Sequence, residues 1–279
     1  MVNLRSRVTR LGVLDIGSNT IHMLIVDAAP GARPDPEAST KSTVRLMQYV
    51  KDDGSIKKSG IEAILTAVDQ CMELAEEYDI TQLLAMATSA IKEAPNSNKI
   101  LRKIEERIGQ SVTVLSGTDE ARLTFLAARR WYGWDAGRLL MLDIGGSSLE
   151  VAMGSDEEPT VALSAAAGAC RITREYLPEG TASVDELEVV RKKVRRILEP
   201  MVDAFPKSKH PAHAVGTSKT FRSLARLAGA VLRQSGREDT WIMTREQLED
   251  WIPRLAAIEP EQRVALPGIT PERTMQIVG

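Results

Sequence analysis

The feature that most constrains the fold of this sequence is a motif that occurs twice. Residues 11–20 read LGVLDIGSNT, and residues 140–148 read LMLDIGGSS. In both copies an apolar run ends in an Asp, a turn of glycine and hydroxyl residues follows, and a second apolar run begins. This pattern predicts two tight β-hairpins, each with a carboxylate and backbone amides at its tip. Because the copies lie about one domain apart, we expect a duplicated fold.

The chemistry of these turns points to phosphate. A turn that aims several N–H groups at an anion is expected to need glycine, because it requires a positive φ and leaves no room for a Cβ atom. A carboxylate beside such a turn would repel phosphate, so we expect it to hold a divalent metal or a water molecule against the phosphate. Two tips facing each other would form a phosphate cleft between two lobes.

Composition excludes several classes of protein. The chain has 279 residues, 43% of them hydrophobic and 27% charged, which is ordinary for a globular protein with room for two domains. The formal charge of -2 favours neither nucleic acid nor membrane as a partner. Cys71 and Cys170 form no paired motif, and the basic N-terminus precedes no long apolar run. We therefore expect a cytoplasmic protein.

Hydrophobic periodicity predicts the same element order in both halves. The first half is expected to contain strands at 10–14, 20–27 and 43–50, a helix at 59–78, a strand at 83–87, a helix at 97–108 and a strand at 112–115. A helix at 118–131 leads to the second half, with strands at 138–142, 149–153 and 160–163, helices at 169–177 and 183–205, a strand at 212–215 and a helix ending at Gly229. The fold class is therefore α/β with mixed sheets, divided into lobes 1–127 and 128–279.

Two features of the C-terminal part carry further expectations. Ser183 with Glu186, and Thr244 with Gln247, have the spacing of helix capping boxes. Residues 270–279 resemble the start of a helix that stops while still apolar, so we expect this end to pack against a missing segment or a partner.

Glu120 is the strongest candidate for catalysis. It lies in the first turn of the helix predicted from residue 118, where the helix dipole stabilises a carboxylate. One interpretation is an ordinary first-turn acid. The other is a general base that orients and deprotonates the water attacking phosphorus, which would require burial or a nearby carboxylate to raise its pKa.

Asp143 and Glu150 flank the second turn and are candidate metal ligands. They lie one hairpin apart, so both could reach one cation, and Mg²⁺ favours one or two carboxylates with water and phosphate oxygens. The alternatives are a turn-forming Asp143 that bonds local amides and a solvated Glu150. Asp15 and Asn19 admit the same two interpretations.

Other segments offer anion sites or ordinary structure. Residues 215–222 place Gly, hydroxyls and Lys219 at a helix start, without the full pattern of a nucleotide-binding P-loop. Residues 86–92 have a similar pattern, in which a strand is followed by hydroxyl residues and a Lys, although helix capping also explains Ser89. His22 is expected to be packed, and the other histidines lack zinc spacing. The basic run 191–196 indicates a solvated face or, alternatively, a polyanion track.

Taken together, the motifs identify a family resemblance over nearly the whole chain. Its carriers are LDIGSNT at 14–20, ATSA at 87–90, SG-x-x-EAR at 116–122, LDIGG-x-S-x-E at 142–150 and VGTSKT at 215–220. The chain resembles the exopolyphosphatase and guanosine pentaphosphatase (Ppx/GppA) family, within the actin, sugar-kinase and heat-shock ATPase superfamily. Residues 129–134, RRWYGW, are similar to the actinobacterial exopolyphosphatase branch.

The resemblance implies two ribonuclease-H-like lobes with a cleft between them, Glu120 as catalytic base, and Asp143 and Glu150 as ligands of Mg²⁺. The implied activity is hydrolysis of the terminal phosphoric anhydride of inorganic polyphosphate by a homodimer, with no nucleic acid or membrane partner. The implied phosphate-binding residues come from both lobes: Asp15, Gly17, Ser18, Asn19, Thr20, Ser89, Lys92, Gly145, Gly146, Ser147, Ser148, Thr217, Ser218 and Lys219.

Two departures from the family pattern keep rival functions open. Lys92 stands where the family usually has Arg and loses bidentate phosphate contact, and Ser147 replaces a third Gly. These departures permit a weakly catalytic sensor of phosphate or an alarmone. Two other rivals are open for any member of this superfamily: a guanosine pentaphosphate 5′-phosphohydrolase and a phosphotransferase using ADP or ATP.

Overall fold

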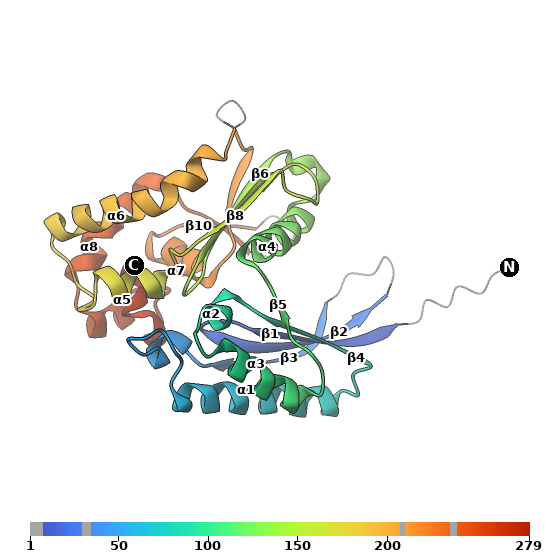
Figure 1. Cartoon of the computed structure of the whole chain (residues 1–279). Helices are drawn as coiled ribbons and strands as arrows, with labels where there is room; N and C mark the ends of the chain where they lie inside the picture. Colours follow the sequence, from blue (N-terminus) through green and yellow to red (C-terminus); the bar gives the residue numbers. More distant parts are fainter. Residues whose placement is uncertain (1–7, 30–34, 207–209, 235–238) are drawn as a thin grey trace. The chain divides into compact units, whose positions relative to one another are not determined.

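The chain forms two compact units, Met1–Ser116 and Gly117–Gly279, each with its own sheet (Figure 1). The computed structural model describes residues 8–29, 35–206, 210–234 and 239–279. The units divide at the start of α4 (Gly117–Tyr132), whereas the sequence boundary at 127/128 falls inside this helix. Glu120 therefore belongs to the same unit as Asp143 and Glu150.

The first unit is built on a five-stranded mixed sheet of order β3-β2-β1-β4-β5. Its strands are β1 (Thr9–Ile16), β2 (Thr20–Ala28), β3 (Pro36–Thr43), β4 (Gln82–Ala87) and β5 (Thr113–Val114). The first three pair antiparallel, and β4 and β5 join in parallel. Its helices are α1 (Lys58–Glu77), α2 (Ser89–Lys92) and α3 (Ser97–Ile108).

The core of the first unit lies between this sheet and the two long helices, α1 and α3 (Figure 1). Ile64 and Val68 recur at helical spacing on α1 and are fully buried, and Ile100 and Ile104 do the same on α3. Gly109 ends α3 in the left-handed conformation with φ 72°, which is typical of a glycine at a helix C-terminus.

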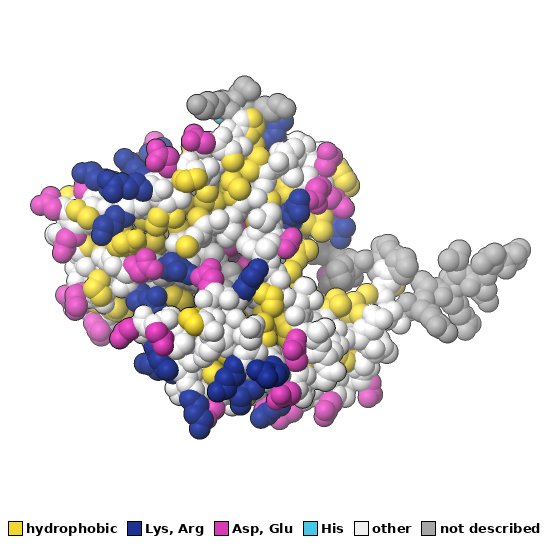
Figure 2. Space-filling model, in the orientation of Figure 1, with side chains coloured by type: hydrophobic (Ala, Val, Ile, Leu, Met, Phe, Trp, Pro, Cys, Tyr) yellow, Lys and Arg dark blue, Asp and Glu magenta, His cyan; other side chains and the backbone are white. Residues whose placement is uncertain are grey.

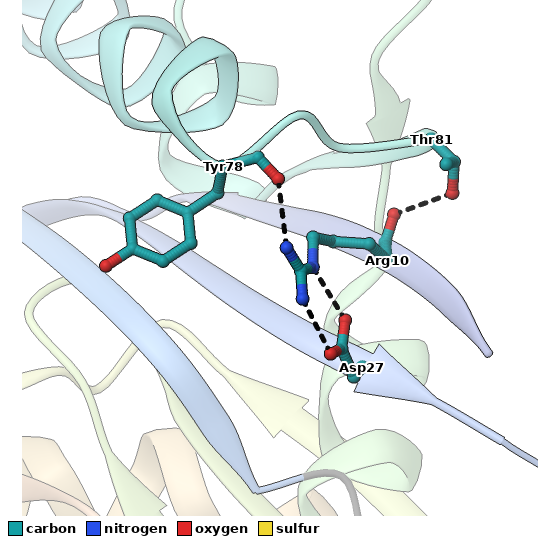
Figure 3. A network of polar contacts seen from close by, with 4 residues as sticks. All are labelled: Arg10, Asp27, Tyr78 and Thr81. Atoms are coloured by element: carbon teal, nitrogen blue, oxygen red, sulfur yellow. Dashed lines mark hydrogen bonds and ion pairs between the residues drawn. The ribbon is translucent and has the colours of Figure 1, made fainter.

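A polar network fixes the end of the β1–β2 hairpin that is remote from its turn (Figure 3). Arg10 lies directly opposite Asp27 and donates two hydrogen bonds of 2.8 Å to its carboxylate. Thr81 donates to the carbonyl of Arg10 at 2.9 Å. A slip of one residue would break this bidentate pair, so the network helps to set the strand register on which the turn depends.

The second unit repeats the strand order of the first. Its four-stranded sheet runs β8-β7-β6-β9, which corresponds to β3-β2-β1-β4. The strands are β6 (Leu139–Ile144), β7 (Leu149–Gly154), β8 (Val161–Ala165) and β9 (His213–Gly216), with β6, β7 and β8 antiparallel and β9 parallel to β6. A separate ribbon pairs β10 (Val231–Gln234) with β11 (Asp239–Ile242). The α/β class with two mixed sheets is confirmed, and so is the topological repeat.

Helices cover both faces of the second sheet. They are α4, α5 (Ala169–Tyr176), α6 (Val184–Asp203), α7 (Lys219–Leu227) and α8 (Arg245–Ala257). Alternate residues of β6 point to opposite faces: Met141 packs with Phe125 of α4, and Leu142 packs in the cluster of α5 and α6. Both predicted capping boxes are present, at Ser183 and at Thr244.

Two sequence expectations are wrong. The third strand is Pro36–Thr43 rather than 43–50, and residues Leu46–Tyr49 form a 3₁₀ turn instead. The C-terminal segment forms short 3₁₀ turns at Pro271–Arg273 and Gln276–Val278, not the start of an α-helix. Ile277 is buried with Leu255 of α8, so this apolar segment packs inside its own unit.

Candidate active site

The two glycine turns have the same backbone geometry. Gly17 N–H donates to Thr20 O at 3.0 Å, and Gly145 N–H donates to Ser148 O at 3.0 Å. The predicted hairpins are therefore confirmed. The expected positive φ is not found at Gly17 or Gly145. At Gly17 the requirement is instead steric, since a Cβ there would lie 3.0 Å from Thr20 O.

The carbonyls of the second turn are all bound on one side. Gly145 O accepts from Ala169 N at 3.0 Å, and Gly146 O accepts from Arg171 N at 3.1 Å. Ser147 O accepts from Gly168 N at 3.2 Å and from Arg171 Nε at 2.9 Å. The start of α5 therefore binds three consecutive carbonyls of the turn.

This arrangement decides where the amides of the turn point. In a trans peptide the N–H is opposed to the C=O, and the chain contains no cis peptide among its described residues. The N–H groups of Gly146, Ser147 and Ser148 consequently point away from α5 and share one side of the turn. Successive amides of this kind form a cradle for an anion. The side chains of Ser147 and Ser148 are themselves buried.

Beside this turn the sheet brings two carboxylates together. Asp143 and Glu150 are direct cross-strand partners, and Ser164 is the next partner in the row. Directly opposed residues project from the same face of the sheet. Ser164 Oγ donates to Glu150 Oε1 at 2.8 Å, and Thr217 Oγ1 donates to Asp143 Oδ2 at 2.6 Å.

Burial makes this pair electrostatically strained. The pKa of Glu150 is raised chiefly by desolvation, since its side chain is only 2% exposed, and the charge of Asp143 raises it further. Hydrogen bonds from Ser148 and Ser164 oppose this shift. Desolvation also raises the pKa of Asp143, against the hydrogen bond from Thr217. Two buried carboxylates of this kind attract a cation.

The start of α4, which carries Glu120, packs against this row. Gly117, the first residue of the helix, packs so closely on β8 that a Cβ there would lie 2.4 Å from the Cβ of Ser164. Glu120 follows in the same first turn and is half-buried, with its Oε2 atom shielded from solvent. A general base at this position is expected to need partial burial, and the side chain of Glu120 is partly buried.

The hydroxyl and lysine residues before α7 have identifiable partners. Thr217 binds Asp143, as described, and Ser218 caps α7 by accepting from Phe221 N at 3.3 Å. Lys219 Nζ lies 3.0 Å from Glu272 Oε1. The pKa of Glu272 is lowered to about 2, mainly by the neighbouring Thr270 side chain and further by Lys219. A phosphate at Lys219 would therefore share this cation with Glu272.

The first unit carries a different row at the matching positions. Asp15 is opposite His22, and His22 is opposite Lys41. Burial lowers the pKa of His22, and the charge of Lys41 lowers it further. The carboxylate of Glu150 thus has an imidazole as its counterpart.

The remaining predicted phosphate residues lie on the first turn and α2. Ser18 and Asn19 form the turn, Thr20 begins β2, and Lys92 ends α2 with its side chain exposed. The side chain of Ser89 lies outside the described part of the structure. The phosphate-binding roles in both units stay predictions.

The acidic pair fits a magnesium ion better than a metal that needs a closed protein cage. Within the described residues no group of three or more His, Cys, Asp or Glu side chains could hold a metal. Mg²⁺ commonly takes only one or two carboxylates and completes its shell with water and phosphate oxygens. Asp143 and Glu150 would supply two such ligands beside the amide cradle of the second turn, and this metal role stays a prediction.

A basic surface lies apart from these turns in the sequence. Figure 2 shows Lys and Arg side chains gathered over α6, and Lys192, Arg195, Arg196 and Glu199 line a hollow of about 330 Å³. No helix among the described residues is long and apolar enough to cross a membrane.

Sequence reasoning assigned no structural role to four residues that shape the site. Ser164 was not recognised because its role depends on the register of a third strand. Gly117, Gly168 and Arg171 act through close approach or bonds to backbone, which local sequence does not reveal. Gly168 is an example of such a close approach. A Cβ atom there would lie 2.4 Å from the Ser147–Ser148 peptide, so only glycine fits at this position.

Comparison with known proteins agrees with this arrangement. The chain is 43% identical over 270 residues to Exopolyphosphatase 1 of Mycobacterium tuberculosis (strain ATCC 25618 / H37Rv), covering 96% of this chain and 78% of that protein. The crystal structure of an exopolyphosphatase from Cytophaga hutchinsonii superposes with a TM-score of 0.84 at 23% identity, covering 97% of this chain and 87% of that one. The Ppx-GppA enzyme of Aquifex aeolicus gives a TM-score of 0.78 at 22% identity, with 97% and 89% covered.

Because the two solved structures are less than 25% identical to this chain, they support the fold alone. The family model described as the Ppx/GppA phosphatase family matches residues 24–279. This match spans nearly the whole chain, including both acidic residues of the second turn. The chain therefore belongs to the Ppx/GppA phosphatase family.

Proposed function

We propose that the protein is an exopolyphosphatase that removes the terminal phosphate of inorganic polyphosphate with the help of Mg²⁺. One observation carries the proposal: three outward-facing amides of the second turn lie beside the opposed carboxylates Asp143 and Glu150. An anion cradle beside a cation site suits a phosphate chain. The mycobacterial relative at 43% identity is named an exopolyphosphatase, which supports this choice of substrate.

The proposed reaction is a single displacement by water. The amides of Gly146, Ser147 and Ser148 hold the terminal phosphate, and Glu120 accepts a proton from the water as its oxygen attacks phosphorus. The P–O bond to the next phosphate breaks, and the shortened chain leaves with the bonding electrons. A Mg²⁺ ion held by Asp143 and Glu150 would supply positive charge to the phosphate oxygens. The products are orthophosphate and a polyphosphate one unit shorter.

Replacing Glu120 tests this mechanism. Glu120→Gln keeps the shape of the side chain but cannot accept the proton, so turnover should fall by about 100- to 10,000-fold while tripolyphosphate binding persists. Phosphate release gives the rate, and calorimetry gives the binding. Glu106→Gln, at an exposed position of α3, is the matched control and should behave like the parent. Turnover by Glu120→Gln near the parental rate would remove Glu120 as the base.

Substrate choice needs a direct comparison. Phosphate release should be measured with tripolyphosphate, long-chain polyphosphate and guanosine pentaphosphate, each with Mg²⁺ and with a chelator. The proposal expects polyphosphate to be preferred and the chelator to abolish release. A preference for guanosine pentaphosphate would favour the nucleotide phosphohydrolase instead.

The proposal extends to the cellular form of the enzyme. We infer a cytoplasmic homodimer, as the family resemblance implies. Sedimentation of the purified protein tests the dimer, since a monomer at micromolar concentration contradicts it.

A further inference from the structure

Arg45 has an unusual backbone conformation beside the first turn. Its φ of 53° and ψ of 58° are left-handed, and among the described residues only Asp79 is another non-glycine residue with positive φ. This region is sterically disfavoured for residues with a Cβ, and Asn or Gly adopts it more easily. A conformation of this kind in a long side chain suggests that the side chain itself is needed.

The left-handed conformation serves the turn directly. It allows consecutive amides to reach the turn carbonyls: Val44 N–H and Arg45 N–H donate to Asn19 O at 2.9 and 3.0 Å, and Leu46 N–H donates to Ser18 O at 2.8 Å. The backbone of Arg45 is therefore within hydrogen-bond distance of the predicted phosphate turn. These bonds explain the conformation of residue 45 but do not explain why it is arginine.

The side chain of Arg45 lacks a hydrogen-bond acceptor within the described part of the chain. Its Nε atom is buried and has no hydrogen-bond partner within the described residues. Other buried or half-buried arginines use their guanidinium: Arg10 binds the Asp27 carboxylate, and Arg263 donates to carbonyls from three segments. Arg129 also has a buried Nε without a partner in the described part of the chain, but its terminal nitrogens donate to two backbone carbonyls. A buried guanidinium N–H without an acceptor is costly, so an acceptor from outside the chain is expected to complete it.

We propose that the guanidinium of Arg45 binds a phosphate oxygen of the substrate beside the first turn. The ligand class follows from the chemistry: the planar guanidinium can donate to two oxygens of one phosphate group at once. This inference rests on the proposed function. It also supplies the bidentate contact that Lys92, a point charge at the end of α2, does not provide.

Two substitutions separate binding from backbone strain. Arg45→Asn accepts the left-handed backbone but removes the guanidinium, so its thermal midpoint should equal or exceed that of the parent. Its KM for long-chain polyphosphate should rise by about 10- to 100-fold, and tripolyphosphate should bind correspondingly more weakly. Arg45→Lys keeps the charge without the planar fork and should recover only part of this loss.

The control is Arg102→Asn, which removes an exposed cation from α3 in the same unit. It should leave KM, binding and the thermal midpoint unchanged. Parental kcat/KM and binding in Arg45→Asn would overturn the inference, as would an equal loss in Arg102→Asn. An inactive parent that still binds tripolyphosphate through Arg45 would instead refute the proposed function and leave this site standing.

Discussion

The two glycine turns share a backbone but have unlike surroundings. Each is closed by the same 3.0 Å bond from the first glycine, and each places an Asp at the end of the preceding strand. Across the sheet, however, Asp15 meets His22 whereas Asp143 meets Glu150. One duplicated hairpin therefore offers two chemistries. The row of the second unit is acidic, whereas the row of the first unit combines a carboxylate, an imidazole and an ammonium group.

The turns also differ in how their carbonyls are held. Residues 44–46 bind Ser18 and Asn19 through backbone amides in the first unit. In the second unit the start of α5 binds Gly145, Gly146 and Ser147, and the Arg171 side chain adds a further bond. The second cradle is thus fixed by one more carbonyl and by a guanidinium. We interpret the second turn as the more rigidly held of the two.

The largest effect on turnover is expected from removing the charge of Glu150, the carboxylate that distinguishes the second row from the first. Glu150→Gln keeps the bonding shape but removes one of the two charges, so Mg²⁺-dependent turnover should fall by more than about 100-fold, because even outer-shell partners contribute 10- to 100-fold. Phosphate release across a Mg²⁺ titration measures this. Ser164→Ala leaves both carboxylates and should lose less. Equal losses in the two variants would argue against Glu150 as a ligand.

A smaller effect is expected from loosening the second cradle. Arg171→Met removes the Nε bond to Ser147 O but keeps much of the stem, so kcat/KM should fall by about tenfold, the scale of one charge-assisted hydrogen bond. Arg171→Lys should recover part of it. Arg174→Met, at an exposed position of the same helix, should match the parent. A parental KM and kcat in Arg171→Met would show that the backbone bonds alone hold the turn.

The smallest effect concerns stability and pH. Because the pKa of Glu150 is raised in the folded state, the native protein binds more protons than the unfolded chain. Without metal, stability should therefore decrease as pH rises from the normal pKa of a glutamic acid through the raised folded value. Glu150→Gln should flatten this slope and raise the metal-free thermal midpoint at neutral pH. Thermal melts at successive pH values measure the slope of stability against pH. A slope in the variant that equals or exceeds the slope of the parent would contradict the assignment.

Local sequence signals predicted most of the elements that position the site. The apolar runs of β1, β2, β6 and β7 and the capping boxes of α6 and α8 were identified because each depends on neighbouring residues. The edge strand β3 was not, since Pro36–Thr43 is rich in Ser and Thr and has no buried residue. The apolar Val44 and Leu46 beside it were misread as a strand, although both are buried in the core of the first unit and Leu46 begins a 3₁₀ turn.

The sequence by itself determined the duplication, the α/β class and the family, because these are written in motifs whose residues lie close together along the chain. It also singled out Glu120, Asp143 and Glu150. Only the tertiary structure decided that His22 is the counterpart of Glu150 and that α5 orients the second turn. It also decided that Arg45 has a buried nitrogen without an acceptor among the described residues. These facts depend on strand register and on contacts between distant segments, which no local pattern encodes.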